Sequence, residues 1–485
     1  MSTNPSASAP APTRYRWVIC LLLFWVTTAN YIDRSVFGNL APEMPRYLHL
    51  ADKYYVDHAA EIKQVHVQHQ HPEVDIKACP ECQKFVDDQV GRDWDEQYWY
   101  MQVVFSAFYA ISMLIMGRLM DVLGLRWGFA FACALWGLAS VSHAFAPQIG
   151  APFGGAVMGF FICRALLAFG EGGNFPAAIK TTAEWFPKRE RALSTGLFNS
   201  GSNIGGILVP YLMPAVIALH IGAITIGWRG AFVMTAIVDL VWIVAWLMIY
   251  RKPEDHPKVN KEELAIIQSD AVETSVKIPW LQLLPHRQTW AFAVAKGMTD
   301  CFWWFYLFGS PDFFNKKFQL DPDHRKYMIM MIYAVASVGS IAGGWLAGHF
   351  MKKGWTTNKA RKITMLICAV AVFPVFYAAF TTDKWVAAIL MTLAASAHQA
   401  WSANAFSLAG DMFPKRVVGS VTGLGGMFGA AGGIVLFLIT GKVLKATGNY
   451  IPVFIMASVG YLLALAIIHL LVPKLELAKI EPKAV

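Results

Sequence analysis

Long apolar stretches alternate with short polar segments along most of the chain. The clearest of these stretches cover residues 21–28, 232–250, 363–380 and 451–472. Most lie within spans close to the ~20 apolar residues that a helix needs to cross a bilayer. We place helices at residues 15–44, 97–120, 127–146, 152–183, 190–217, 229–250, 288–314, 327–351, 361–380, 384–411, 416–444 and 450–472. The sequence therefore predicts an all-α polytopic membrane protein with twelve transmembrane helices.

Composition and charge agree with this class. The 485 residues are 56% hydrophobic and 15% charged. The net charge of +9 does not indicate nucleic-acid binding, because the excess Lys and Arg lie in short loops, as in cytoplasmic loops of membrane proteins. No cleavable signal peptide is apparent. Since twelve is even, we expect both termini on the cytoplasmic side of the inner (plasma) membrane, residues 1–14 as a disordered tail and 474–485 as a second tail.

The chain contains an internal repeat with an offset of 227 residues. The run Phe-Pro-Lys-Arg begins at 186 and 413, Thr-Gly-Leu begins at 195 and 422, and Gly-Gly begins at 205 and 432. One constant offset predicts two pseudo-symmetric six-helix bundles, at 15–250 and 287–473, with a substrate site between them. The polar residues 251–286 are expected to form a cytoplasmic linker.

Four ionisable residues lie in predicted helices one and four. Arg164 and Glu171 are seven residues apart, so they share one helical face about 10 Å apart. Asp33 and Arg34 are adjacent and point about 100° apart, although Arg34 could alternatively extend to the outer interface. Carboxyl groups removed from water favour the protonated form, and arginine matches a carboxylate with two parallel hydrogen bonds. The set therefore predicts a proton-coupled carrier of an organic anion.

The loop between predicted helices two and three carries a recognisable motif. Residues 117–126 read GRLMDVLGLR, which matches the G-x-L-x-D-x-x-G-x-R signature of the major facilitator superfamily at every defining position. The resemblance implies the major facilitator fold and a cytoplasmic gate. The gate residues would be Gly117, Asp121, Gly124 and Arg126. Because Gly348 stands where the second half would need the aspartate, the two gates are not expected to be symmetric.

Further runs resemble the hexuronate transporter branch of the anion:cation symporter family. They are NYIDR, RALLAFGEGGNFPAAIK, AEWFPKRERA, GLFNSGSNIGG, CFWWFYLF and AHQAWSANAFSLAGDMFPK. The resemblance implies proton symport of glucuronate, galacturonate or similar acids. Asp33 and Glu171 would be protonation sites, and Arg34 would bind the substrate carboxylate. Tyr31 and Tyr109 would line the cavity, and Arg164 would serve charge coupling.

The second half offers polar and aromatic residues in place of charges. His398 is the counterpart of Glu171 at the 227-residue offset. Candidate contacts to a sugar are the polar residues His398, Gln399, Asn404 and Ser407 and the ring faces of Trp303, Trp304 and Tyr306, although packing is an alternative for any aromatic residue here. No role follows for Asp239, Lys296 or Asp300.

An insertion at 46–96 separates the first two predicted helices, on the outer side. It contains His58, His66, His69 and His71, and the pair Cys79 and Cys82. The spacing allows a metal site, but a single C-x-x-C in an oxidising exterior favours a disulfide-stapled or redox-silent cap. We therefore assign no metal ligands and no cofactor. The expected coupling ion is H⁺.

These observations predict a monomeric, proton-coupled importer of hexuronates or related sugar acids that works by alternating access. Its partners would be a small organic anion and the lipid bilayer, not nucleic acid. The main alternative is a carrier of another organic anion, such as an aldonate, an aromatic acid or a dicarboxylate. A cation exporter is disfavoured by the arginines, and a non-transporting sensor stays possible. An enzyme is disfavoured because no nucleophile and base occur at useful spacing.

Overall fold

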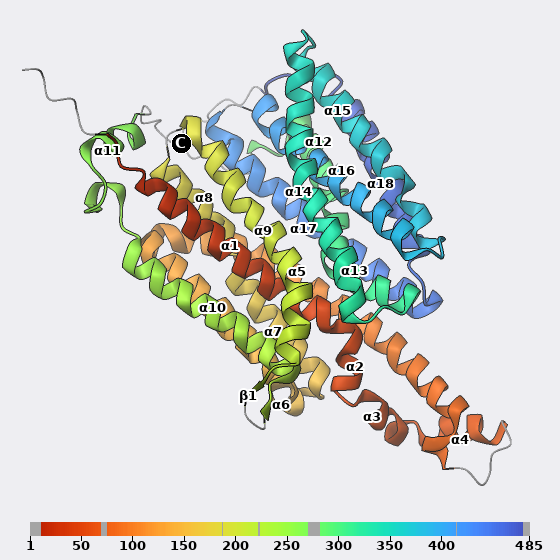
Figure 1. Cartoon of the computed structure of the whole chain (residues 1–485). Coiled ribbons are helices and arrows are strands. Elements are labelled where there is room, and N and C mark those ends of the chain that lie inside the picture. Colours follow the sequence, from red (N-terminus) through yellow and green to blue (C-terminus); the bar gives the residue numbers. More distant parts are fainter. Residues whose placement is uncertain are drawn as a thin grey trace, which may run out of the picture.

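The computed structural model describes residues 11–68, 75–186, 188–221, 224–269, 282–413 and 415–478. Two groups of long helices lie side by side, coloured red to yellow-green and green to blue in Figure 1. The first group contains α1 (Tyr15–Leu40), α5 (Pro80–Ala144), α6 (Ala146–Gly150), η3 (Ala151–Phe153), α7 (Ala156–Glu171), α8 (Asn174–Trp185), α9 (Lys188–Ile217) and α10 (Gly227–Ile249). A short antiparallel pair, β1 (His220–Ile221) and β2 (Ile224–Thr225), joins α9 to α10.

The second group is also built mainly from long helices. It contains α12 (Arg287–Gly297), α13 (Asp300–Phe318), α14 (Pro322–Lys352), α15 (Thr357–Val372), η6 (Phe373–Ala379), α16 (Lys384–Met412), α17 (Lys415–Thr447) and α18 (Ile451–Leu471). Nine helices of the described chain are long and apolar enough to cross a membrane. The other three predicted spans are helical as well, within α5, α12 with α13, and α16. The predicted division into two helical bundles is thus present.

Two predicted helices are broken at one point each. The span predicted at 152–183 is α7 followed by α8, because Gly172 and Gly173 interrupt it. The span predicted at 288–314 is α12 followed by α13, with the break at Met298 and Thr299. Interrupted helices free backbone groups and are tolerated at membrane depth where protein surrounds them. Both breaks lie beside buried charged residues.

The insertion forms a small helical cap on one side of the two groups, at the lower right in Figure 1. It consists of η1 (Ala41–Glu43), α2 (Met44–Tyr47), α3 (Leu50–Asp57), α4 (Ala59–Gln68), η2 (Ile76–Ala78) and the first turns of α5. The helix α5 continues without a break from this cap into the second predicted span. We call this face the cap side and the opposite face, which carries α11 (Lys261–Ile267), the linker side.

The two halves pack through α5 against α17 and through α9 against α14. Close packing within the first half depends on glycine, since a Cβ at Gly205 of α9 would lie 2.8 Å from the Thr28 carbonyl oxygen of α1. Ion pairs join the halves on the cap side: Arg325 bonds Glu43 at 2.8 Å, Lys445 bonds Glu96 at 2.6 Å, and Lys316 bonds Asp95. The cap side is therefore closed in this structure.

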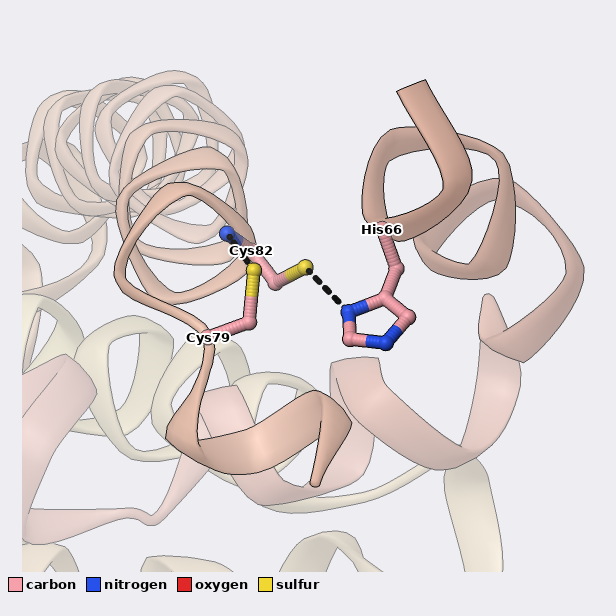
Figure 2. Close-up of side chains that lie close together, drawn as sticks. All are labelled: His66, Cys79 and Cys82. Atoms are coloured by element: carbon pink, nitrogen blue, oxygen red, sulfur yellow. Dashed lines mark hydrogen bonds between the residues drawn. The ribbon is translucent and has the colours of Figure 1, made fainter. Parts of the chain in front are cut away.

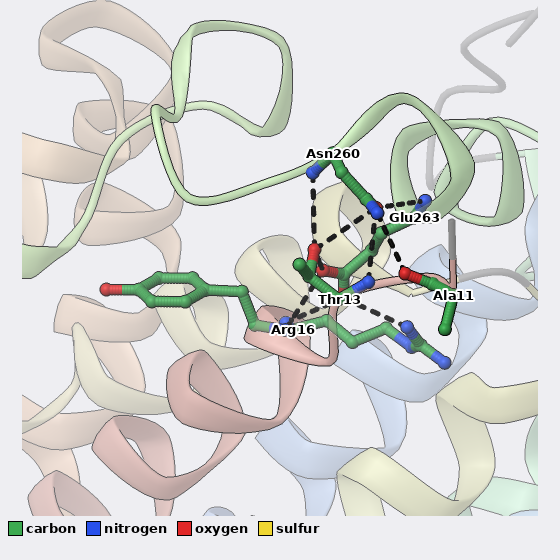
Figure 3. A network of polar contacts seen from close by, with 6 residues as sticks. Ala11, Thr13, Arg16, Asn260 and Glu263 are labelled. Atoms are coloured by element: carbon green, nitrogen blue, oxygen red, sulfur yellow. Dashed lines mark hydrogen bonds and ion pairs between the residues drawn. The ribbon is translucent and has the colours of Figure 1, made fainter. Parts of the chain in front are cut away.

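The start of α1 is fixed by the linker. The Glu263 carboxylate of α11 accepts hydrogen bonds from the Tyr15 amide at 3.0 Å and the Arg16 amide at 3.1 Å, and it pairs with the Arg16 side chain (Figure 3). Thr13 bonds Asn260 from the same region. A carboxylate at a helix N-terminus satisfies free amide groups and complements the helix dipole. Residues 11–14 are therefore held in place, although they belong to the tail expected to be disordered.

Candidate functional site

The centre of the first half holds an ion pair between α1 and the end of α7. Both the Nε and the Nη2 atoms of Arg34 lie 2.7 Å from Glu171 Oε2. The Arg34 side chain is 3% exposed and that of Glu171 is 0% exposed, so Arg34 does not extend to an outer interface. Glu171 is the last residue of α7, immediately before the glycine break. The break therefore positions the carboxylate for a partner on another helix.

Aromatic rings surround the Arg34 guanidinium. Its Cζ lies 4.6 Å from the ring centre of Tyr109, 4.8 Å from that of Tyr31 and 5.8 Å from that of Trp304. Such positions are favourable because the ring face attracts a cation. Tyr31 and Tyr109 belong to the first half, whereas Trp304 comes from α13. The second half thus contributes directly to the surroundings of Arg34.

Arg164 occupies a separate position from the Arg34–Glu171 pair. Its Nη2 donates to Gln102 Oε1 at 2.7 Å, and its Cζ lies 4.2 Å from the ring centre of Phe105. The same ring lies 5.3 Å from the Arg34 Cζ. The side chain is completely buried, and its Nε and Nη1 atoms have no hydrogen-bond partner within the described residues. Arg164 therefore retains unused donors at the centre of the protein.

Asp33 faces away from Arg34, toward α5 and α10. Its Oδ1 accepts from Ser140 Oγ at 2.8 Å, and that hydroxyl lies 2.9 Å from Thr235 Oγ1. The carboxyl group of Asp239 on α10 lies close enough to interact with that of Asp33. Neither Asp239 oxygen has a hydrogen-bond partner in the described structure. Asp239, for which the sequence suggested no role, is thus the carboxyl neighbour of Asp33.

The second half has its own charged pair at the break between α12 and α13. Lys296 Nζ lies 2.7 Å from Asp300 Oδ2, and it lies 3.8 Å from the ring centre of Phe406. His398 Nδ1 lies 2.7 Å from the Tyr461 hydroxyl, and its ring stacks on Trp303 with centres 5.6 Å apart. The predicted contact Trp303 therefore packs on His398, while its neighbour Trp304 approaches Arg34.

The remaining predicted sugar contacts lie on α16. Asn404 Nδ2 donates to the Gly343 carbonyl at 3.0 Å, and its Oδ1 accepts from Arg361 at 3.3 Å. This amide therefore joins α14, α15 and α16. Ser407 donates to the Ala403 carbonyl within its own helix, and Gln399 is half-buried. No bond between these residues and Arg34 or Glu171 is present in the described structure.

The predicted gate is only partly within the described residues, since the side chain of Asp121 is outside them and Gly117 has none. Gly124 interrupts α5 with φ 73° and ψ 160°, a conformation that glycine adopts readily. Arg126 Nη2 donates to the Leu247 carbonyl at 2.7 Å. A cavity of about 530 Å³ on the linker side is lined by Gly124, Arg126 and their neighbours. The motif thus turns the chain and anchors it to α10.

Sequence reasoning missed several residues around the two arginines. Gln102 and Phe105 precede Tyr109 by seven and four residues, so helical spacing from Tyr109 would have identified them. Asn30 lies four residues before Arg34 and Asn174 three residues after Glu171. Both amide side chains are buried without a hydrogen-bond partner in the described structure. Buried unpaired amides of this kind are ready to bind water or ligand hydroxyls.

Comparisons with known proteins agree with the helical architecture and with a transporter. The profile of the Major Facilitator Superfamily matches residues 23–437. The hexuronate transporter of Escherichia coli K12 is 28% identical over 79% of this chain and 88% of its own length. The galacturonate transporter of Dickeya chrysanthemi is 31% identical over 53% of this chain and 72% of its own length. An inward-facing structure of a bacterial homologue of the lysosomal transporter Spinster has a TM-score of 0.65, with 15% identity, over 95% of this chain and 97% of its own.

Proposed function

Because this chain belongs to the Major Facilitator Superfamily and is a transporter, we propose that it imports hexuronates or related sugar acids together with protons. The Arg34–Glu171 ion pair is the observation that carries the proposal. In the absence of substrate, the guanidinium is neutralised by a carboxylate of the protein. A substrate carboxylate can take that position once Glu171 is protonated and no longer competes for the guanidinium. One proton therefore prepares the binding site for one anion.

Charge balance sets the stoichiometry of this mechanism. The buried set contains two arginines, Arg34 and Arg164, and three carboxyl groups, those of Asp33, Glu171 and Asp239. Two neighbouring buried carboxyl groups share one proton because two carboxylates would repel each other, so Asp33 and Asp239 together carry one negative charge. The empty site is then neutral. A monoanionic substrate restores neutrality when it brings one further proton, to Glu171.

Recognition of the substrate would combine both halves. Arg34 would bind the carboxylate, with Tyr31, Tyr109 and Trp304 around it. The unpaired amides of Asn30 and Asn174 are available for sugar hydroxyl groups. Since Trp304 belongs to the second half, its approach to Arg34 couples substrate binding to the rocking of the halves. In the proposed orientation the cap is extracytoplasmic, and the closed cap side corresponds to the inward-facing stage of the cycle.

A dicarboxylic sugar acid is the second candidate substrate. Arg164 keeps two unused donors, and its guanidinium faces the same Phe105 ring as Arg34. A substrate with carboxylates at both ends would bind both arginines. The same charge balance then requires two protons for each substrate molecule.

Transport by the full-length protein in proteoliposomes tests the proposal. Labelled glucuronate should accumulate when the outside is made acidic, and Glu171→Gln should abolish this uphill uptake while exchange of substrate across the membrane remains. Glu171→Asp is the matched control, because it keeps a carboxyl group at this position. Uphill uptake by Glu171→Gln equal to that of the unaltered protein would refute the coupling role. Competition by galacturonate, gluconate and glucarate decides between mono- and dicarboxylate substrates.

A further inference from the structure

The cap has a small apolar core that is separate from the core of the membrane helices. Its buried residues are Ile62, Val86, Val90, Cys79 and Cys82. Partly buried side chains from α3, α4 and the start of α5 cover it. Two thiols and an adjacent imidazole are the polar groups that this core encloses, as Figure 2 shows. Packing alone does not require these three groups to converge.

The three side chains come from two different helices. His66 lies near the end of α4, Cys79 is the N-cap residue of α5, and Cys82 lies in the first turn of α5. One potential ligand atom from each residue lies within 4.8 Å of the others. Both cysteines are completely buried and His66 is 8% exposed. The cluster therefore fastens α4 to the start of α5.

The distance between two of the ligand atoms matches tetrahedral coordination. Cys82 Sγ lies 3.7 Å from His66 Nδ1. With metal–sulfur bonds of about 2.3 Å and metal–nitrogen bonds of about 2.05 Å, tetrahedral angles place these two ligand atoms about 3.6 Å apart. Little movement is thus needed to bind a metal ion between them. The Glu81 carboxylate lies next to the cluster, 3.6 Å from Cys79 Sγ.

The chemistry of the thiols favours a metal over a disulfide. Both cysteines are free thiols in the structure, and the Cys82 amide donates to Cys79 Sγ at 3.3 Å. A bound cation would displace the protons of both thiols, because the thiolate is the form that binds a metal. A disulfide would also leave the convergence of His66 on Cys82 unexplained.

We propose that His66, Cys79 and Cys82 form a binding site for a thiophilic transition-metal ion, with Zn²⁺ as the fitting species. Two thiolates and an imidazole are typical ligands of tetrahedral zinc, and the fourth position is left for water. The ion cross-links α4 to α5 and so stabilises the cap. This proposal replaces the expectation of a disulfide-stapled or redox-silent cap without metal ligands.

Metal binding by the full-length protein, purified in detergent under reducing conditions, tests the site. We expect one Zn²⁺ per chain by elemental analysis, and a tetrahedral thiolate spectrum when Co²⁺ is added instead. Cys82→Ser and His66→Ala should each weaken Zn²⁺ binding at least about tenfold. His58→Ala, in the same cap but outside the cluster, and Cys163→Ser, in a membrane helix, are matched controls that should bind normally. Binding should weaken as the pH falls, because the ion competes with thiol protons.

A second measurement uses the unaltered protein and does not depend on the folding of variants. Zn²⁺ should protect two thiols from a cysteine-specific reagent, and a chelator should remove the protection. A reduced protein that binds no Zn²⁺, or one whose cap thiols react equally with and without it, would overturn the proposal. Binding that persists unchanged in both the Cys82→Ser and His66→Ala variants would overturn it as well.

Discussion

Replacement of Arg325 by glutamine should open the cap side of the molecule. Arg325 lies at the start of α14 and is 2% exposed. Its Nη1 lies 2.8 Å and its Nη2 3.1 Å from the two Glu43 oxygens, and Nη2 also donates to the Asn39 carbonyl at 2.6 Å. Since Glu43 and Asn39 belong to the first half, all three bonds must break when the halves separate on this side.

The size of the effect follows from burial. Removal of one partner from a buried ion pair costs about 3–5 kcal/mol when the other charge stays buried. The Glu43 side chain is 20% exposed, so water compensates part of the loss. We therefore expect about 2 kcal/mol, which is roughly a thirtyfold shift of the equilibrium toward the form open on the cap side. Lys326→Gln is the matched control, because its ion pair with Asp323 lies within α14, and its contact with the first half is only a ring contact to the exposed Tyr211, 5.6 Å away.

Distances between spin labels on the cap side would measure this shift. Phe153 and Phe380 are exposed positions in the two halves, at 63% and 50% exposure, and cysteines placed there can carry the labels. Arg325→Gln should increase the long-distance population strongly, and Lys326→Gln should not. The double variant Glu43→Gln/Arg325→Gln should open little more than Arg325→Gln alone. An unchanged distance distribution in Arg325→Gln, or equal opening in the control, would refute the reasoning.

Three further predictions concern other buried polar groups. Burial and the nearby Asp312 raise the pKa of Asp95 to about 7 in the closed form, whereas a hydrated Asp95 in the open form titrates near 4. Acidification between about pH 7 and 4 should therefore favour the closed form by up to tenfold per pH unit. Asp95→Asn should abolish this pH dependence in the spin-label assay. Gln102→Leu removes the hydrogen bond to Arg164 and should lower the free energy of unfolding by about 2 kcal/mol. Thermal unfolding in detergent measures this loss, and an unchanged melting temperature would contradict the prediction. Asp239→Asn should leave thermal stability at pH 8 equal or higher, because the amide replaces the protonated member of the proposed carboxyl pair and needs no bound proton, and a clear loss would contradict that pair.

Much of the fold follows from the sequence because apolar stretches in a bilayer have few alternatives to helices. The depth of Arg34 and Glu171 could also be anticipated from their place in such stretches. Their pairing could not, since the two residues are 137 positions apart and helical spacing relates Glu171 to Arg164 instead. The bond joins α1 to the last residue of α7, so it depends on how these two helices lie against each other.

The remaining differences have similar physical causes. Trp303 and Trp304 are adjacent and point about 100° apart, so only the packing of α13 decides which ring approaches Arg34. Asp239 acquires a partner through the packing of α10 on α1, which no local pattern specifies. His66 and the two cysteines lie on separate helices of the cap, so their convergence depends on how α4 folds back on α5.

Because α5 is continuous, the cap moves together with the second predicted span and amplifies its tilt. From Pro80 to Glu96 the helix extends about 25 Å beyond the predicted second span. A tilt of about 10° in that span would therefore move the tip of the cap by about 4 Å. Bound antibody fragments or fluorophores on the cap would report this displacement in real time, and the added mass outside the micelle would help to align particle images. A transporter with short loops has no comparable domain outside the membrane to which such a probe could be attached.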